Sequence, residues 1–285
     1  MTTTAGRRAP RADCTVTPDG RITFDLSGHD GERTGAPELL LRLRGAKGPD
    51  ARTVRLPLGP LDDGRLRAVL PADTEYAEGR WDVHLREADA DDDGAVAVEP
   101  GIRDLRRLVD LAPGTGRVAV RIPYPTLDGR LAVRCWLRAP HAEAGAVTLD
   151  GAAMTVRGRL HGARSLDGAQ VEARQPGAAG SVVRVPVTGG GEDGAFAFTL
   201  PLDRLADGPV TAQQLWTLWL LPGPGEAGED GEGEGVRISR ILDDIWDRKK
   251  IHVYPGRGAG AGVRATPCYS TDNDLCVRLE PEPAA

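Results

Sequence analysis

Aromatic residues are scarce in this chain of 285 residues, where phenylalanine, tryptophan and tyrosine together make up only 4%. No stretch approaches the roughly 20 apolar residues of a membrane-spanning helix, and the polar N-terminal residues lack the apolar run of a secretory signal. Acidic residues outnumber basic ones by 42 to 36, so the formal net charge of −6 offers no field to attract nucleic acid or anionic lipid. We therefore expect a soluble cytoplasmic protein that neither inserts into a membrane nor binds nucleic acid.

The four cysteines form no Cys-x-x-Cys pair, so their spacing predicts neither a zinc ribbon nor a redox motif. In a reducing compartment they remain thiols, and buried small side chains are their simplest role. Glycine and proline, by contrast, are plentiful, with 37 and 22 residues. This abundance disfavours long helices.

An internal repeat organises the chain. Residues 63–71 match residues 193–201 without a gap, and further matched segments follow in the same order. Trp81 pairs with Trp216 in this alignment, and Tyr124 pairs with Tyr269. We predict two copies of one domain at residues 13–140 and 145–281, between a disordered tail at 1–12 and a short tail at 282–285.

Within each copy, apolar residues alternate with polar ones, as in Ile22, Phe24 and Leu26. A period of two predicts strands with one buried face, and turns rich in Asp-Gly and Pro-Gly separate the runs. The predicted fold class is therefore all-β: two tandem immunoglobulin-like antiparallel β-sandwich domains from an internal duplication, without the Cys-Trp-Cys pattern of antibody domains. Short helical pieces are expected at residues 202–206 and 241–249.

An aromatic, a hydroxyl and a carboxylate recur where the final strand of each copy begins. Such a set could bind sugar, because an aromatic face stacks on a pyranose ring while carboxylates and amides bond its hydroxyl groups. The alternative is ordinary turn chemistry, together with a tyrosine that fastens a Greek-key crossover. The candidate binding residues are Tyr124, Thr126 and Asp128 in the first copy, and Tyr269, Thr271, Asp272, Asn273 and Asp274 in the second.

Asp89, Asp91 and Asp93 begin an acidic loop that resembles the start of a calcium-binding loop, in which alternate carboxylates converge on a hard cation. Position 12 of such a loop, where a glutamate should complete the site, holds Pro100. The aspartates are candidate metal ligands, and a solvated hairpin tip is the alternative.

Basic and acidic residues surround Trp246 in the densest charged cluster of the second copy. Tryptophan and arginine are favoured at protein interfaces, so this cluster is a candidate docking surface. Equally, Trp246 could cover the end of its own sandwich. The candidate docking residues are Arg240, Trp246, Arg248, Lys249 and Lys250.

No Gly-x-Ser-x-Gly elbow, zinc-binding histidine pair or phosphate-binding loop occurs in a suitable context, so the sequence predicts no catalytic residue and no cofactor. The chain nevertheless resembles a known group in residues 79–86, 120–131 and 242–255. These strings are similar to actinobacterial tandem β-sandwich proteins, often labelled transferases, that accompany glycosyl- and glycerophosphotransferases of cell-wall glycopolymer synthesis. The resemblance rests on strand and turn motifs, so it implies a setting but does not identify an active site.

The resulting hypothesis is a non-enzymatic accessory or binding module linked to cell-envelope glycopolymer biosynthesis. Its expected partner is a membrane-associated transferase or a glycan, and the chain itself would be a monomer or weak oligomer. Whether it is an enzyme stays open, because one alternative is a transferase with its site between the two sandwiches. The third alternative is a structural spacer.

Overall fold

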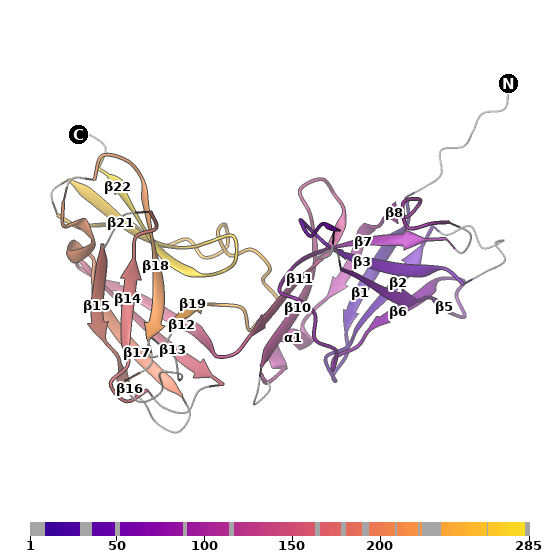
Figure 1. Cartoon of the computed structure of the whole chain (residues 1–285), viewed down its shortest axis with the longest axis horizontal. Coiled ribbons are helices and arrows are strands. Elements are labelled where there is room, and N and C mark those ends of the chain that lie inside the picture. Colours follow the sequence, from indigo (N-terminus) through magenta and orange to yellow (C-terminus); the bar gives the residue numbers. More distant parts are fainter. Residues whose placement is uncertain are drawn as a thin grey trace. The chain divides into compact units, whose positions relative to one another are not determined.

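The computed structural model describes residues 9–28, 36–48, 52–87, 90–113, 117–162, 166–177, 181–189, 194–208, 210–221, 223, 235–260 and 262–282. The chain divides into two compact units. Unit 1 comprises Met1–Ala112, Ala119–Leu137 and Leu242–Trp246, and unit 2 comprises Pro113–Val118, Arg138–Ile241 and Asp247–Ala285. Each unit is built from strands (Figure 1).

Unit 1 contains two sheets. The first has the order β5 (Gly59–Pro60), β6 (Leu66–Leu70), β2 (Ile22–Ser27), β1 (Arg11–Val16) and β9 (Glu99–Asp104). The second has the order β10 (Val118–Pro125), β11 (Leu131–Arg138), β7 (Gly79–Arg86), β3 (Glu38–Leu43) and β4 (Thr53–Pro57), with β8 (Val96–Ala97) beside β7. Strand β1 is antiparallel to β2 and parallel to β9.

Unit 2 repeats both strand orders, but a further strand pair joins them in a single sheet. One runs β16 (Thr188–Gly189), β17 (Ala195–Pro201), β13 (Ala153–His161), β12 (His141–Asp150) and β19 (Val236–Ser239). The other runs β20 (Arg257–Gly258), β21 (Val263–Tyr269), β22 (Leu275–Pro281), β18 (Gln214–Leu221), β14 (Gln170–Arg174) and β15 (Val182–Pro186). Strand β12 pairs in parallel with β19, as β1 does with β9.

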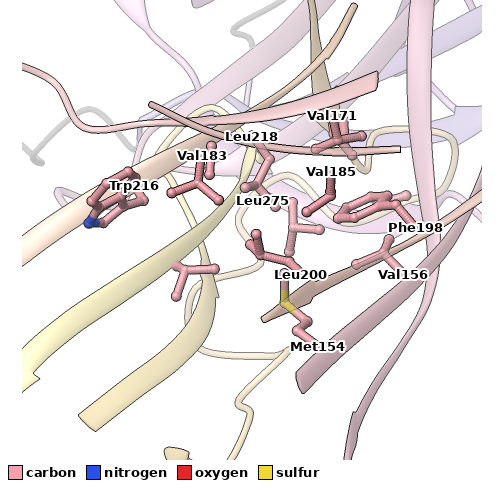
Figure 2. Close-up of a cluster of buried hydrophobic side chains, with 14 of the residues drawn as sticks. Met154, Val156, Val171, Val183, Val185, Phe198, Leu200, Trp216, Leu218 and Leu275 are labelled. Atoms are coloured by element: carbon pink, nitrogen blue, oxygen red, sulfur yellow. The ribbon is translucent and has the colours of Figure 1, made fainter. Parts of the chain in front are cut away.

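The alternating sequence pattern sets which side chains enter each core. In β7, Trp81, Val83 and Leu85 are buried while the residues between them are half-buried. The core of unit 2 gathers aliphatic side chains with Phe198 and Trp216 (Figure 2). The predicted all-β sandwich fold is thereby confirmed, and its cores are mainly aliphatic because the few aromatic residues occupy selected strand positions.

The helical expectations are met only in part. A 3₁₀ helix, η2 (Asp203–Ala206), lies within residues 202–206, whereas the expected helix at 241–249 is absent from the described structure. There the carboxylates of Asp243 and Asp247 accept backbone N–H bonds from Ile245 and Lys249, which gives the chain local turns in place of a helix. The short helix α1 (Arg107–Asp110) was not anticipated.

Three of the four cysteines are buried, and all four are free thiols. Burial raises the pKa of Cys14 and of Cys135 to about 12, so both stay protonated at neutral pH. In the part of the chain that the structure describes, no helix is long and apolar enough to cross a bilayer.

Candidate functional site

A hollow of about 370 Å³ opens on unit 1 beside strand β7. Its walls come from the residue after β3, from β7 and β8, and from the turn between β10 and β11. It therefore collects side chains that are far apart in the sequence. The lining residues are Arg44, Asp82, Val83, His84, Ala97, Asp128, Arg130 and Leu131.

Arg44 and Asp82 form one wall of this hollow as a two-pronged ion pair. The distance from Arg44 Nε to Asp82 Oδ2 is 3.1 Å, and that from Nη2 to Oδ1 is 2.5 Å. The hydrogen bonds to Asp82 raise the pKa of Arg44. Because a planar guanidinium matches a carboxylate in this geometry, the pair fixes the direction of both side chains.

Another part of the lining is the turn between β10 and β11. The hydroxyl of Thr126 donates to Asp128 Oδ1 at 2.6 Å, and Arg130 Nε lies 3.2 Å from Asp128 Oδ2. The hydrogen bond from Thr126 is the main reason that the pKa of Asp128 is lowered. Asp128 thus presents an ionised carboxylate at the rim.

The same five-residue pattern, Thr-x-Asp-Gly-Arg, also makes the turn between β1 and β2. There the Thr17 hydroxyl donates to Asp19 at 2.5 Å, and Arg21 lies 2.7 Å from the Asp19 carboxylate. The internal bonds of the Thr126 turn are therefore turn chemistry, as the structural alternative supposed. Its distinguishing feature is that Asp128 lines a hollow.

Two polar atoms near this hollow are buried without a hydrogen-bond partner in the structure described: His84 Nδ1 and the hydroxyl of Tyr124. Burial lowers the pKa of His84, which favours a neutral imidazole, and burial raises the pKa of Tyr124. Arg44 and Asp82 are among the charges that act on the Tyr124 hydroxyl. His84 itself lines the hollow.

Trp246 belongs to unit 1 through contacts with two side chains. Its ring stacks on that of Tyr124, with centroids 6.0 Å apart and an interplanar angle of 23°. The guanidinium of Arg103 lies 4.8 Å from the indole centroid. Trp246 is half-buried. Tyr124 and Trp246, which were predicted for two different roles, thus form one aromatic contact.

The corresponding turn of unit 2 is drawn into the fold. Asp274 is 5% exposed, and its carboxylate accepts a 2.6 Å hydrogen bond from Ser239. Arg138 and Arg237 approach the same carboxylate at 3.2 and 3.1 Å. The Ser270 hydroxyl accepts the backbone N–H of Asp274 at 3.1 Å. Asp274 is thus an internal counter-charge.

Asn273 and Arg248 fasten the segment after β19 to this turn. The fully buried Arg248 donates its backbone N–H to Asn273 Oδ1 at 3.2 Å and its Nε to the Arg240 carbonyl at 2.6 Å. Its guanidinium also contacts His252 at 3.2 Å and lies 5.9 Å from the Tyr269 ring centroid. Arg248 therefore lies inside unit 2.

The other predicted residues of unit 2 lie nearer the surface. Thr271, Lys249 and Lys250 are exposed, whereas Asp272 and Arg240 are half-buried. Ligand binding by the Tyr269–Asp274 set and docking by the Arg240–Lys250 cluster stay predictions. Asn273 and Tyr269 both contact Arg248, which the sequence analysis had assigned to a separate role.

The predicted acidic loop lies only partly within the described residues, because Asp89 falls outside them. Asp91 accepts the Gly94 N–H at 2.8 Å, while Asp93 is exposed. The intervening Asp92 pairs with Arg55 at 2.6 Å. Within the described ranges, no three His, Cys, Asp or Glu side chains are placed to hold a metal ion together.

Sequence reasoning did not single out Arg44, Asp82 or His84 as site residues. A signal was present, since Asp82 and His84 alternate with three buried apolar residues and must share the other face of β7. What the sequence could not supply is Arg44, which reaches Asp82 from across 38 positions of the chain.

No protein-family model matches the chain, and no curated protein matches it. A solved structure that resembles it is that of S. aureus TarS 217-571, with 14% sequence identity and a TM-score of 0.30. The match covers 67% of this chain and 55% of that one, so the chain spans little more than half of the solved fragment. A similarity this low carries no argument about function.

Proposed function

We propose that the protein is a non-enzymatic binding module that serves cell-envelope glycopolymer biosynthesis by holding the glycan. The hollow of unit 1 is the proposed binding site. The observation that carries the proposal is that two arginine–carboxylate pairs, Arg44–Asp82 and Arg130–Asp128, line this one hollow together. Hydroxyl-bearing repeat units are its proposed ligand.

The chemistry of the walls supports a hydroxyl-rich ligand. A sugar or glycerol hydroxyl both donates and accepts hydrogen bonds, and the hollow offers guanidinium donors beside carboxylate acceptors. Two hydrogen bonds between Arg44 and Asp82 hold both side chains in place within the protein, so little side-chain ordering is needed on binding. His84, whose lowered pKa favours the neutral ring, adds a group that can donate or accept.

A holding role suits these carboxylates better than proton transfer does. Asp128 has a lowered pKa because Thr126 donates to it, and Arg130 pairs with the same carboxylate. A general acid needs the opposite shift, so that its proton is retained near neutral pH. The link to glycopolymer synthesis rests on the sequence resemblance, and a membrane-associated transferase is the partner that would supply or receive the glycan.

Isothermal titration of the full chain with a purified uncharged polysaccharide tests the proposal, because a polyanionic polymer would be repelled by the net charge of −6. Asp128→Asn should weaken binding about tenfold, since it removes an ionised acceptor from the rim. Asp19→Asn is the matched control, because it makes the same change in the same turn pattern outside the hollow. Arg44→Gln should weaken binding by a similar factor.

The proposal fails if the polymer does not bind, or if Asp19→Asn weakens binding as much as Asp128→Asn. A second assay follows the release of nucleotide from an activated sugar or an activated glycerol phosphate. Turnover by the wild-type chain that Arg44→Gln abolishes would replace the binding role with a transferase.

A further inference from the structure

A second hollow, of about 410 Å³, opens on unit 2. Its walls come from described residues on either side of the connection between β14 and β15, from the 3₁₀ helix η2 and the residues after it, and from the start of β18. None of its residues was a candidate from the sequence. Its lining includes Gln175, Val183, Leu205, Gln214 and Trp216.

Trp216 is the distinctive member of this set. The residue is 3% exposed, and its indole Nε1 has no hydrogen-bond partner among the residues that the structure describes. Figure 2 shows the indole at one edge of the apolar cluster, with its nitrogen turned away from Leu218 and Leu275. A buried N–H without an acceptor is unfavourable and uncommon, so an acceptor supplied by a ligand would be favoured there.

The matched residue of unit 1 shows that this orphan donor is not a requirement of the fold. Trp81 donates its indole N–H to the Ala77 carbonyl at 3.0 Å, and Tyr76 packs edge-on against it at 6.2 Å. Trp81 follows Pro71 by 10 positions, whereas Trp216 follows Pro201 by 15. The longer connection of unit 2 leaves a hollow and an unpaired N–H beside its tryptophan.

The remaining walls combine apolar side chains with polar ones. Leu205 and Val183 are buried apolar side chains that can pack against ring C–H groups. The amides of Gln175 and Gln214 both donate and accept, as sugar hydroxyl groups do. One arginine and one aspartate, Arg204 and Asp207, leave the lining without net charge, and the volume lies within the usual range for small-ligand sites.

We infer that this hollow binds a single sugar residue, with the ring against the apolar wall and one ligand oxygen accepting the Trp216 N–H bond. This inference deepens the proposed function by adding a second glycan contact, and it relies on that function only for the choice of ligand class. The two sites share no residue, so each can be tested separately.

The indole N–H resonances of the 15N-labelled full chain provide a direct reading. The Trp216 signal is assigned by its disappearance in Trp216→Phe. The probes are the methyl glycosides of glucose, galactose and N-acetylglucosamine, with glycerol as a polyol that has no ring. We expect at least one glycoside to shift the Trp216 signal saturably, while the Trp81 signal, whose N–H is already bonded, stays in place.

A matched control lies on the same strand. The indole N–H of Trp219 donates to Thr217 Oγ1 at 2.9 Å, and Trp219 does not line the hollow. Trp216→Phe should weaken glycoside binding about tenfold, the effect of one buried hydrogen bond, and Trp219→Phe should leave it unchanged. Gln214→Leu should also weaken glycoside binding. Because Gln214 is half-buried, this variant keeps the test available if Trp216→Phe does not fold.

The inference is overturned if no glycoside shifts the Trp216 signal, if all indole signals shift together, or if glycerol acts as strongly as the sugars. A proline-rich peptide that shifts the Trp216 signal in place of the sugars would also overturn it. Failure here with Asp128-dependent polymer binding intact leaves the proposed function standing. A glycoside response without polymer binding would contradict the proposed function and leave the Trp216 site standing.

Discussion

Asp274 provides the sharpest test of how unit 2 is held together. Its carboxylate is the shared acceptor for Ser239, Arg138 and Arg237, and only 6% of its side chain is exposed. Asp274→Ala removes this charge, so Arg138 and Arg237 lose the carboxylate that they share. Asp274→Asn keeps the shape and one acceptor for the Ser239 hydroxyl but removes the charge.

The expected cost follows from the exposure of the two arginines. Breaking one side of a buried ion pair costs about 3–5 kcal/mol, because the remaining charge stays in a poorly solvated place. The side chain of Arg138 is 14% exposed, whereas that of Arg237 is 50% exposed and can turn to water. We therefore expect Asp274→Ala to lower the free energy of unfolding of unit 2 by about 3 kcal/mol, and Asp274→Asn by about 1–2 kcal/mol.

Urea unfolding combined with hydrogen exchange of the β22 amides measures this effect. Exchange in β2 of unit 1 serves as an internal reference, because it reports a different unit. Asp104→Ala is the control variant, since Asp104 pairs with Arg106 at the surface, where the Arg106 side chain is 87% exposed. The reasoning is refuted if Asp274→Ala destabilises the protein no more than Asp104→Ala does, or if the loss of protection falls on β2.

Three further predictions concern backbone packing, aromatic stacking and pH. Gly158→Ala should destabilise unit 2 by about 1–3 kcal/mol, because a Cβ there would meet Phe196 and the Glu143 carbonyl, whereas Gly59→Ala, with open space around it, should be neutral in urea unfolding. Trp246→Ala should cost about 1 kcal/mol through the lost stack on Tyr124, seen as faster hydrogen exchange in β10. The lowered pKa of His84 means that the unfolded chain takes up this proton first as the pH falls. The neutral ring therefore favours the folded state fully above pH 6.5, and this stability is lost as the pH falls from 6.5 toward the lower pKa of the folded chain. The free energy of unfolding should thus decrease with falling pH in this window, and His84→Gln should make the decrease smaller.

Each of these has a clear contrary result. Equal stability of the two glycine variants would show that β12 and β13 can separate without cost. Unchanged exchange in β10 would mean that the Trp246 contact is incidental. A pH slope that His84→Gln leaves intact would assign the slope to another group, and His161, whose pKa burial also lowers, is the first candidate.

The strands were predictable because burial on one face imposes a period of two on the sequence. Ile22, Phe24 and Leu26 predict β2, and all three are buried. The expected helix at 241–249 failed for a local reason, since aspartate side chains there bond nearby backbone N–H groups. Composition alone does not reveal which of two local hydrogen-bonding patterns a short polar segment will choose.

The sites were less predictable because they depend on pairings across the chain. The repeat predicted matched roles for the Asp128 and Asp274 turns, but burial separates them: the Asp128 carboxylate is exposed and the Asp274 carboxylate is inside the fold. Arg248 looked like a surface charge beside Lys249, yet it is fully buried. Its position follows from the carbonyl of Arg240 and the side chain of Asn273, which no sequence pattern connects to it.

The two repeats arrange their matched turns and their matched tryptophans differently. Unit 2 shows that the turn before the last strand can be tied down by buried ion pairs, yet unit 1 leaves that turn at an open hollow. Conversely, the matched Trp81 of unit 1 donates its indole N–H to a backbone carbonyl, whereas the indole N–H of Trp216 in unit 2 has no acceptor among the described residues. Each closed arrangement occurs in one copy, so neither opening is forced by the strand order. Because an unpaired buried donor reduces stability, the ligand acceptor that we infer for Trp216 would offset a cost that Trp81 avoids within unit 1.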